Sequence, residues 1–455
     1  MDHTFVTKVM KQSIFNHFIE EDKCVLCYNG WSDAQVLISH KCYQMLKNND
    51  IECLQERYAQ VYDTLCNSGF LIDEKSDELG ILRLQNKREV FSSDIYYLMI
   101  YPTQDCNLKC WYCYETHIKN SKMSNAVLEA VLNHITRVFE SKKYSFIRIT
   151  FFGGEPLLYY EKVVKPILQH TQGQAEKHKI DWTPFFVTNA SLLSLKVVQE
   201  MVQYKPLFQI TLDGGRDKHD MTRIYKSNNN KGTYDKILGA LKLISSCCTY
   251  SHNGMSSIAT IRINYENSTL ESIDNLLRDL SQLDPDKFFI HLERVWQTIN
   301  TSSPESVVLL KDTLKKMNGM GFSVGHGIFG YKRVSCPAEV DKYAIINWDG
   351  NVYKCNGRTL VDKDKVGVLG KDGVIIWDDN KIAKRSAVAT FENSICLSCC
   401  MLPQCLGPCS QKQIELVDNN DDNLKKVCAL NLLDMTLDDY IRVNFELNMS
   451  KTKSE

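Results

Sequence analysis

The chain has 455 residues, 44% of them hydrophobic, with 54 basic and 55 acidic side chains. This length is sufficient for two or three domains with a sizeable core. The nearly neutral charge balance argues against a general nucleic-acid or membrane-surface binder. The sequence contains no run of about 18 apolar residues, so we expect no transmembrane helix. Residues 1–23 lack the basic and then apolar pattern of a signal peptide, so we expect a cytoplasmic protein without nucleic-acid or membrane partners.

Residues 1–92 combine a predicted strand pair around the sequence CVLCYNG with helical stretches at 40–49 and 56–73. Gly69 follows an amphipathic run and is typical of the end of a helix. We therefore expect a small, separate α+β module in this region.

From about residue 93, short β-rich runs alternate with helical stretches. Continuous apolar strands separated by helices favour a parallel sheet covered by helices, so we predict an α/β domain of about six units, a partial (β/α)6 barrel similar to a TIM barrel. The chemistry of such folds lies at the C-terminal ends of the strands. The predicted strands are 95–101, 146–152, 184–188, 207–212, 257–263 and 287–292, and the predicted helices are 124–140 with Ser124 as N-cap, 193–204, 234–245 and 270–280.

After about residue 335 the helical patterns recede. Residues 343–355 predict a β-hairpin with its turn at Asp349 and Gly350. A second cysteine-rich region follows this hairpin.

The chain contains 18 cysteines, and they are unevenly distributed. Because the cytoplasm keeps thiols reduced, clustered cysteines there indicate ligands of zinc or of iron–sulfur centres. The first cluster, Cys106, Cys110 and Cys113, directly follows the first predicted strand of the barrel. Three thiolates on a four-iron cluster leave one iron open for a ligand that is not protein. His117 offers a fourth ligand for zinc, so a zinc site is the alternative.

The segment CNLKCWYC resembles the cysteine loop of radical S-adenosylmethionine (SAM) enzymes, including an aromatic residue before the last cysteine. The resemblance implies that SAM chelates the open iron through its methionine moiety. One electron from the cluster would then release a 5′-deoxyadenosyl radical, which abstracts a hydrogen atom from the substrate. Carried over residue by residue, the expected SAM contacts are Tyr112, Gly153, Gly154, Glu155, Asn189, Thr211, Asp213, Arg223 and Asn264.

The resemblance implies roles for some of these residues, and the sequence differs from the family pattern at two positions. Bare glycine backbone would let the methionine amino group approach, with Glu155 stabilising its charge, although a plain strand-to-helix turn also explains the glycines. Arg223 would hold the SAM carboxylate by two hydrogen bonds. Ala190 replaces a glycine of the family beside Asn189, and Thr211 replaces a serine. We expect structural roles for His219 and Asp220.

Seven further cysteines resemble the SPASM extension of this family, which binds two auxiliary four-iron clusters. On that resemblance Cys396, Cys399, Cys405 and Cys428 ligate one cluster, and Cys336, Cys355 and Cys409 ligate the other. The second set is one ligand short, so we expect an open iron there, with Cys400 as the alternative fourth ligand. A zinc ribbon is the other explanation of this spacing. The remaining cysteines are expected to be buried small hydrophobes: Cys24, Cys27, Cys42, Cys53, Cys66, Cys247 and Cys248.

The expected organisation is a peptide-recognition-like, winged-helix-like module at 1–92, a radical SAM partial barrel at 93–310, a bridging segment at 311–335 and a SPASM domain at 336–455. The resemblance is to maturases of ribosomally synthesised peptides, which install a thioether or carbon–carbon crosslink. The N-terminal module would hold the precursor's leader by strand addition, and flavodoxin or ferredoxin would supply electrons, in an anaerobic or low-oxygen host.

Two alternatives remain open from the sequence. An anaerobic sulfatase maturase, which forms formylglycine, shares both cysteine patterns, although its cysteine loop usually lies nearer the N-terminus. A non-enzymatic zinc scaffold is the other. The pattern identifies neither the substrate, nor the bond formed, nor a catalytic acid or base, nor the oligomeric state.

Overall fold

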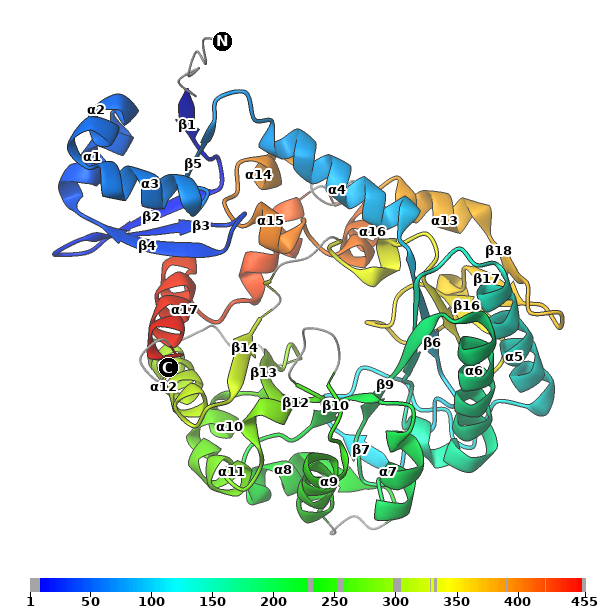
Figure 1. Cartoon of the computed structure of the whole chain (residues 1–455). Helices are drawn as coiled ribbons and strands as arrows, with labels where there is room; N and C mark the ends of the chain where they lie inside the picture. The colour runs from blue at the N-terminus through cyan, green and yellow to red at the C-terminus, as the bar shows by residue number, and fades with distance from the viewer. Residues whose placement is uncertain are drawn as a thin grey trace. The chain divides into compact units, whose positions relative to one another are not determined.

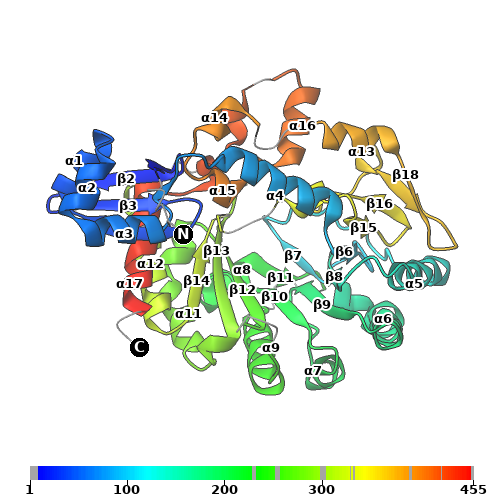
Figure 2. The same ribbon diagram turned by 45° about the horizontal axis from the view of Figure 1, so that its top comes forward.

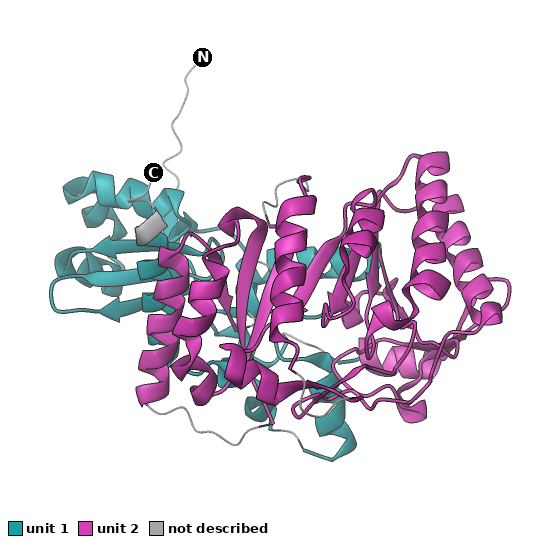
Figure 3. Cartoon of the chain, turned by 90° about the horizontal axis from the view of Figure 1, so that it is seen from below, with its two compact units in different colours: residues 1–92, 328–336, 387–449 teal, residues 93–327, 337–386, 450–455 magenta. Residues whose placement is uncertain are grey.

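The computed structural model describes residues 9–227, 232–251, 257–297, 304–327, 329–330, 334–388, 392–421 and 423–451. The chain divides into two compact units (Figure 3). One unit comprises residues 1–92, 328–336 and 387–449, and the other comprises residues 93–327, 337–386 and 450–455. The expected SPASM region, 336–455, is therefore distributed over both units.

The larger unit is built on an 11-stranded sheet with the order β14-β13-β12-β10-β9-β8-β6-β15-β16-β17-β18. The strands from β14 to β6 are parallel to one another. They are β6 (Ile95–Ile100), β8 (Phe146–Phe151), β9 (Asp181–Thr188), β10 (Leu207–Thr211), β12 (Ala259–Tyr265), β13 (Phe288–Arg294) and β14 (Ser323–His326). The sheet ends at β14 without closing, which confirms the partial barrel.

All six predicted barrel strands are present, and β14 is a further parallel strand that the sequence analysis did not predict. Its sequence, SVGH, is short and has a single large apolar residue, so it lacks the continuous apolar run of a buried strand. Parallel pairing with β13 nevertheless provides hydrogen-bond partners for its backbone groups, with Ile290 opposite Val324.

Helices cover the outer face of these strands (Figures 1 and 2). The predicted N-cap of α5 is confirmed, since the Ser124 hydroxyl accepts a hydrogen bond from the backbone N–H of Val127 at 3.3 Å. The predicted helix 270–280 is instead two short helices that meet at Ser272. The helices are α5 (Asn125–Glu140), α6 (Lys165–His178), α7 (Leu195–Val202), α8 (Arg216–Thr222), α9 (Tyr234–Cys247), α10 (Asn267–Glu271), α11 (Ile273–Leu280) and α12 (Pro304–Gly319).

The predicted hairpin is present as β15 (Ala344–Ile346) and β16 (Asn351–Tyr353), with Gly350 at φ +85° in its turn. Strand β15 continues the barrel sheet by pairing in parallel with β6. The antiparallel strands β17 (Gly367–Leu369) and β18 (Ile375–Trp377), and then α13 (Asp379–Ser386), follow the hairpin.

The smaller unit contains a three-stranded antiparallel sheet of β2 (Asn16–Glu20), β3 (Val25–Asn29) and β4 (Ala34–Ile38), one strand more than predicted. Gly69 adopts φ +79° after α3, as expected for a helix end. One face of the sheet shares a core with the helices that follow it, and the other face packs with C-terminal residues that include Met401 and Ile441. The remaining elements are β1 (Met10–Gln12), α1 (His40–Lys47), α2 (Ile51–Arg57), α3 (Ala59–Asn67), β5 (Leu71–Asp73), α4 (Glu78–Ser92), α14 (Ser394–Leu397), α15 (Leu402–Cys405), α16 (Ser410–Asp418) and α17 (Leu437–Lys451).

Among the helices of the described ranges, none combines the length and apolar character that a bilayer span requires.

Candidate active site

The cysteine loop begins directly after β6, at the C-terminal end of the barrel strands. Its short strand β7 (Leu108–Cys110) pairs antiparallel with β11 (Arg223–Tyr225), which places Arg223 opposite Cys110. Cys106 is buried, Cys110 is partly buried and Cys113 is exposed. The sequence analysis did not predict this pairing, because two strands of three residues carry no periodic signal.

Gly153 and Gly154 bring the end of β8 into contact with the backbone before Cys106. The backbone N–H of Gly154 donates to the carbonyl of Thr103 at 3.2 Å. A Cβ atom on Gly153 would lie 2.3 Å from the Thr103 oxygen, and one on Gly154 would lie 2.1 Å from the Asp105 oxygen. These glycines are therefore required by the close approach of two backbone segments, whether or not a ligand also approaches them.

Glu155 is fully buried, and the ends of β8 and β9 contact its carboxylate. It accepts hydrogen bonds from the Thr188 hydroxyl at 2.7 Å, the Asn189 backbone N–H at 2.8 Å and the Leu157 backbone N–H at 3.0 Å. Burial raises the pKa of this carboxyl group, while the three donors oppose the increase. In this structure Glu155 orders the neighbouring strand ends, and its contact with SAM stays a prediction.

Asn189 connects the end of β9 to the cysteine loop. Its Nδ2 donates to Oδ1 of Asn107 at 2.9 Å and lies 3.7 Å from Sγ of Cys106. Ala190 adopts φ +61°, a left-handed conformation that favours glycine. The glycine of the family pattern at this position therefore has a backbone explanation, and alanine retains the same local geometry.

Four predicted SAM contacts form one hydrogen-bonded group around the Tyr112 hydroxyl, in which Asp213 and Arg223 are buried and Tyr112 and Asn264 are partly buried. Tyr112 is hydrogen-bonded to the Asp213 carboxylate, and it accepts from Nη1 of Arg223 at 2.6 Å and from Nδ2 of Asn264 at 3.1 Å. The backbone N–H of Asn264 also donates to Asp213 at 2.8 Å. Nε of Arg223 is buried without a hydrogen-bond partner in the described part of the chain, so this guanidinium has a donor available for an anionic ligand.

The residues around this group have structural contacts. Nδ1 of His219 accepts from the Asp213 backbone N–H at 3.0 Å, so its Nε2 carries the proton toward the Thr233 hydroxyl, also at 3.0 Å. Asp220 accepts from the backbone N–H groups of Thr233 and Tyr234, at the start of α9. Thr211 is the last residue of β10, and its predicted contact with SAM is not tested by this geometry.

The three cysteines and His117 are the candidate metal ligands of the cysteine loop. Sγ of Cys113 lies 3.7 Å from Nε2 of His117, the fourth ligand of the zinc alternative. Within the described ranges, no group of three or more Cys, His, Asp or Glu side chains is arranged around a single ion site. Three soft thiols on one loop, beside an arginine with an unpartnered donor, match a four-iron cluster that leaves one corner for an anionic chelator.

The predicted auxiliary ligands are divided between the two units. Cys336, Cys396, Cys399, Cys405, Cys409 and Cys428 belong to the smaller unit, and Cys355 belongs to the larger one. The assignments to two clusters therefore stay predictions. Cys400 is buried in an apolar cluster with Ile19, Leu26 and Tyr28, which favours a packing role for its side chain.

The expectation for the remaining cysteines holds in part. Three are buried, namely Cys27, Cys42 and Cys248. The other four, Cys24, Cys53, Cys66 and Cys247, are only partly buried, so the expectation of full burial was wrong for them.

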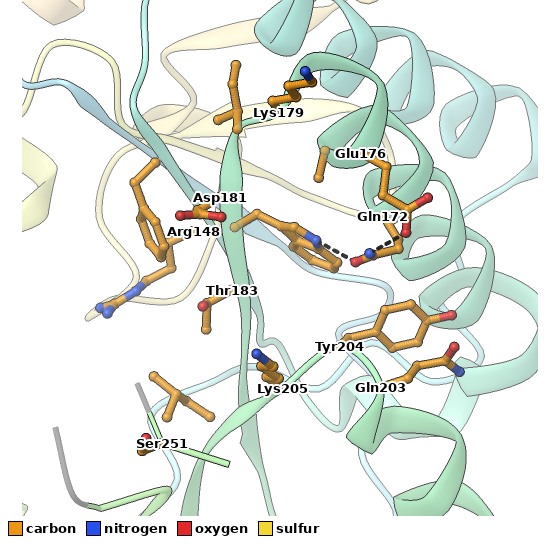
Figure 4. Close-up of a pocket in the computed structure, with 15 residues that line it drawn as sticks. Arg148, Gln172, Glu176, Lys179, Asp181, Thr183, Gln203, Tyr204, Lys205 and Ser251 are labelled. Atoms are coloured by element: carbon orange, nitrogen blue, oxygen red, sulfur yellow. Dashed lines mark hydrogen bonds between the residues drawn. The ribbon is translucent and has the colours of Figure 1, made fainter. Parts of the chain in front are cut away.

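A pocket of about 690 Å³ lies at the opposite end of the barrel strands (Figure 4). Arg148, Asp181 and Trp182 line it, all near the N-terminal ends of β8 and β9. Trp182 donates to Gln172 at 2.9 Å. Because β6, β8 and β9 are parallel, this pocket is remote from the cysteine loop and plays no part in the site described above.

Comparison with known proteins identifies the class. Residues 100–255 match the Radical SAM superfamily, so this part of the chain is a radical SAM domain. A radical SAM domain implies SAM and a four-iron cluster as its cofactors.

Two curated relatives are 25% identical to parts of the chain. The radical SAM cyclopropyl synthase TigE of Paramaledivibacter caminithermalis matches over 201 residues, which cover 37% of this chain and 42% of the relative. The cysteine-type anaerobic sulfatase-maturating enzyme of Clostridium novyi matches over 164 residues, 31% of this chain and 38% of the relative. The chain thus spans less than half the length of these two relatives.

Among solved structures, native anSMEcpe with bound AdoMet and the Cp18Cys peptide superposes with a TM-score of 0.57 at 18% identity. The superposition covers 78% of this chain and 97% of that one. This similarity shows the fold.

Proposed function

We propose that this enzyme matures a ribosomally synthesised peptide, abstracting a hydrogen atom and installing a thioether or carbon–carbon crosslink. The observation that carries the radical chemistry is the hydrogen-bonded group around Tyr112, which joins the cysteine loop to Arg223 and to two strand ends of the barrel. SAM bound at a reduced four-iron cluster supplies the 5′-deoxyadenosyl radical.

The chain's own residues would position SAM and exclude water. Cys106, Cys110 and Cys113 would hold the cluster, and the free Nε donor of Arg223 would bind the SAM carboxylate. The pairing of β7 with β11 aligns this arginine with Cys110, so the cluster ligand and the carboxylate donor are positioned together.

A peptide substrate is supported by the relatives and by the smaller unit. The anSMEcpe structure contains a bound peptide. The sheet of residues 16–38 has two edge strands, β2 and β4, and an extended leader could add to a sheet edge through main-chain hydrogen bonds. We further propose two auxiliary four-iron clusters in the SPASM region and a cytoplasmic reductant such as flavodoxin or ferredoxin.

Formylglycine formation is the second candidate, because a sulfatase-maturating enzyme is among the relatives and the anSMEcpe fold is similar. Anaerobic co-expression with short cysteine-containing peptides encoded beside this gene separates the two. Crosslinking removes two hydrogens per bond in the mass spectrum, whereas formylglycine creates an aldehyde that reacts with a hydrazide probe. No change in any peptide would contradict both.

The radical step has its own test. Replacing Cys106, Cys110 and Cys113 together by Ala should abolish reductive cleavage of SAM and leave the iron of the auxiliary clusters in place. Continued formation of 5′-deoxyadenosine by this variant would contradict the mechanism. Zinc in place of iron in the anaerobically purified wild type would support the scaffold alternative.

A further inference from the structure

A row of polar and charged side chains lies on the face of the barrel sheet that carries Asn264, a member of the group around Tyr112. Along β12 and β13, Ile261, Ile263 and Leu292 are fully buried, whereas the alternating residues are only partly buried. These alternating residues point to the face that carries Asn264, the partner of Tyr112. The row consists of Arg262, Asn264, His291 and Glu293.

The row is linked to the cysteine loop by successive contacts. Nε of Arg262 donates to Oδ1 of Asn264 at 2.9 Å, and Nη2 of Arg262 lies 3.9 Å from Oε2 of Glu293. Glu293 is the register partner of Asn264 in the parallel pair of β12 and β13. After β13 the chain turns toward the cysteine loop, where the Gln297 side chain donates to the backbone carbonyl of Tyr112.

Glu293 is held in one orientation and retains a free oxygen. Oε2 contacts Nε2 of His291 at 3.1 Å, while Oε1 makes no hydrogen bond within the described ranges. Desolvation raises the pKa of Glu293, but the His291 hydrogen bond and the charge of Arg262 oppose burial, and the pKa is lowered overall. The group is therefore a carboxylate near neutral pH, fixed on one side and open on the other.

We propose that Glu293 is the proton acceptor of the reaction, with Arg262 and His291 as its positioning residues. This inference rests on the proposed function. After a hydrogen atom has left the substrate, closure of a bond between the carbon radical and a second group X–H releases one proton and one electron. Oε1 of Glu293 takes the proton and becomes a carboxylic acid, and the electron passes to a one-electron acceptor of the iron–sulfur class.

The experiment uses the holoenzyme and the peptide that the wild type modifies in co-expression, resynthesised with deuterium at carbon. Glu293→Gln preserves size and a hydrogen-bond acceptor but removes the base. We expect it to transfer deuterium into 5′-deoxyadenosine as the wild type does, while crosslinked product falls by about 100-fold. Glu293→Asp, which keeps a base, should recover part of that loss. The melting temperature of each variant verifies that it is folded.

Glu200→Gln is the matched control, because Glu200 is an ion-paired carboxylate on α7, 2.9 Å from Lys165, on the outside of the barrel. It should leave both deuterium transfer and product unchanged. Product formation by Glu293→Gln at the wild-type rate would overturn the role of Glu293 and leave the proposed function intact. Joint loss of deuterium transfer and product would also overturn it, because Glu293 would then act before proton transfer. A wild type that modifies no peptide would refute the proposed function itself.

Discussion

Nη1 of Arg223 donates to the Tyr112 hydroxyl at 2.6 Å, although the two residues are 111 positions apart in the sequence. Arg223 begins β11 and Tyr112 follows β7, so the pairing of these two short strands brings them together. Arg223 is buried and Tyr112 is partly buried, and this contact stabilises the cysteine loop against the barrel.

Tyr112→Phe should lower the free energy of unfolding by about 1–3 kcal/mol, because the buried Asp213 and Arg223 side chains would lose a hydrogen-bond partner. The control is Tyr159→Phe, whose hydroxyl makes no hydrogen bond within the described ranges. Chemical denaturation of the two variants measures the difference. Equal stability of both variants would show that the Tyr112 hydroxyl contributes little.

Gly154→Ala should destabilise the cysteine loop and reduce the iron bound there, because the new Cβ would lie 2.1 Å from the Asp105 oxygen. The backbone around Gly154 and the backbone around Asp105 are held together by hydrogen bonds, so neither segment can move away easily to relieve the clash. Gly239→Ala in α9 is the control, since nothing lies within 4 Å of its Cβ, and it should stabilise the helix by up to about 1 kcal/mol. Melting temperature and iron content, measured together, test both expectations.

The burial of His326 predicts that the stability of the folded protein depends on pH. Burial lowers its pKa from 6.5 to about 4, so the folded protein holds a neutral imidazole, while the unfolded chain binds a proton below about pH 6.5. Stability should therefore fall as the pH decreases from 6.5 toward 4, by about 3 kcal/mol from this residue. His326→Gln, which can keep a hydrogen bond to Tyr265, should show a shallower decline in melting temperature. Identical slopes in both proteins would contradict the assignment.

Cys400→Ala should retain the full iron content, because its side chain packs among Ile19, Leu26 and Tyr28. Cys399→Ala should lose iron, since Cys399 is a predicted ligand of an auxiliary cluster. Iron analysis and the electron paramagnetic resonance spectrum of the reduced protein compare the two variants. Loss of iron from Cys400→Ala would instead support its role as the fourth ligand.

The sequence by itself was sufficient to predict six strands of the barrel and the cysteine loop. Strands such as β6 and β8 carry continuous apolar runs, and helices such as α5 carry an N-cap and a 3.6-residue period, so local patterns predict them. The spacing of Cys106, Cys110 and Cys113 is also local, and its resemblance to the cysteine loop of radical SAM enzymes implied the cofactor. These features depend only on residues that are close together in the sequence, so the sequence is enough to predict them.

Only the tertiary structure decided which side chains meet. The pairing of β7 with β11, the strand β14 and the contact of Glu293 with Arg262 and His291 depend on strand register between distant segments. Register is set by packing of the whole sheet, and a shift of one residue would move each side chain to the opposite face. The sequence suggested that a close approach explains the glycine at position 154. Only the fold shows that the approaching group is the backbone of Asp105.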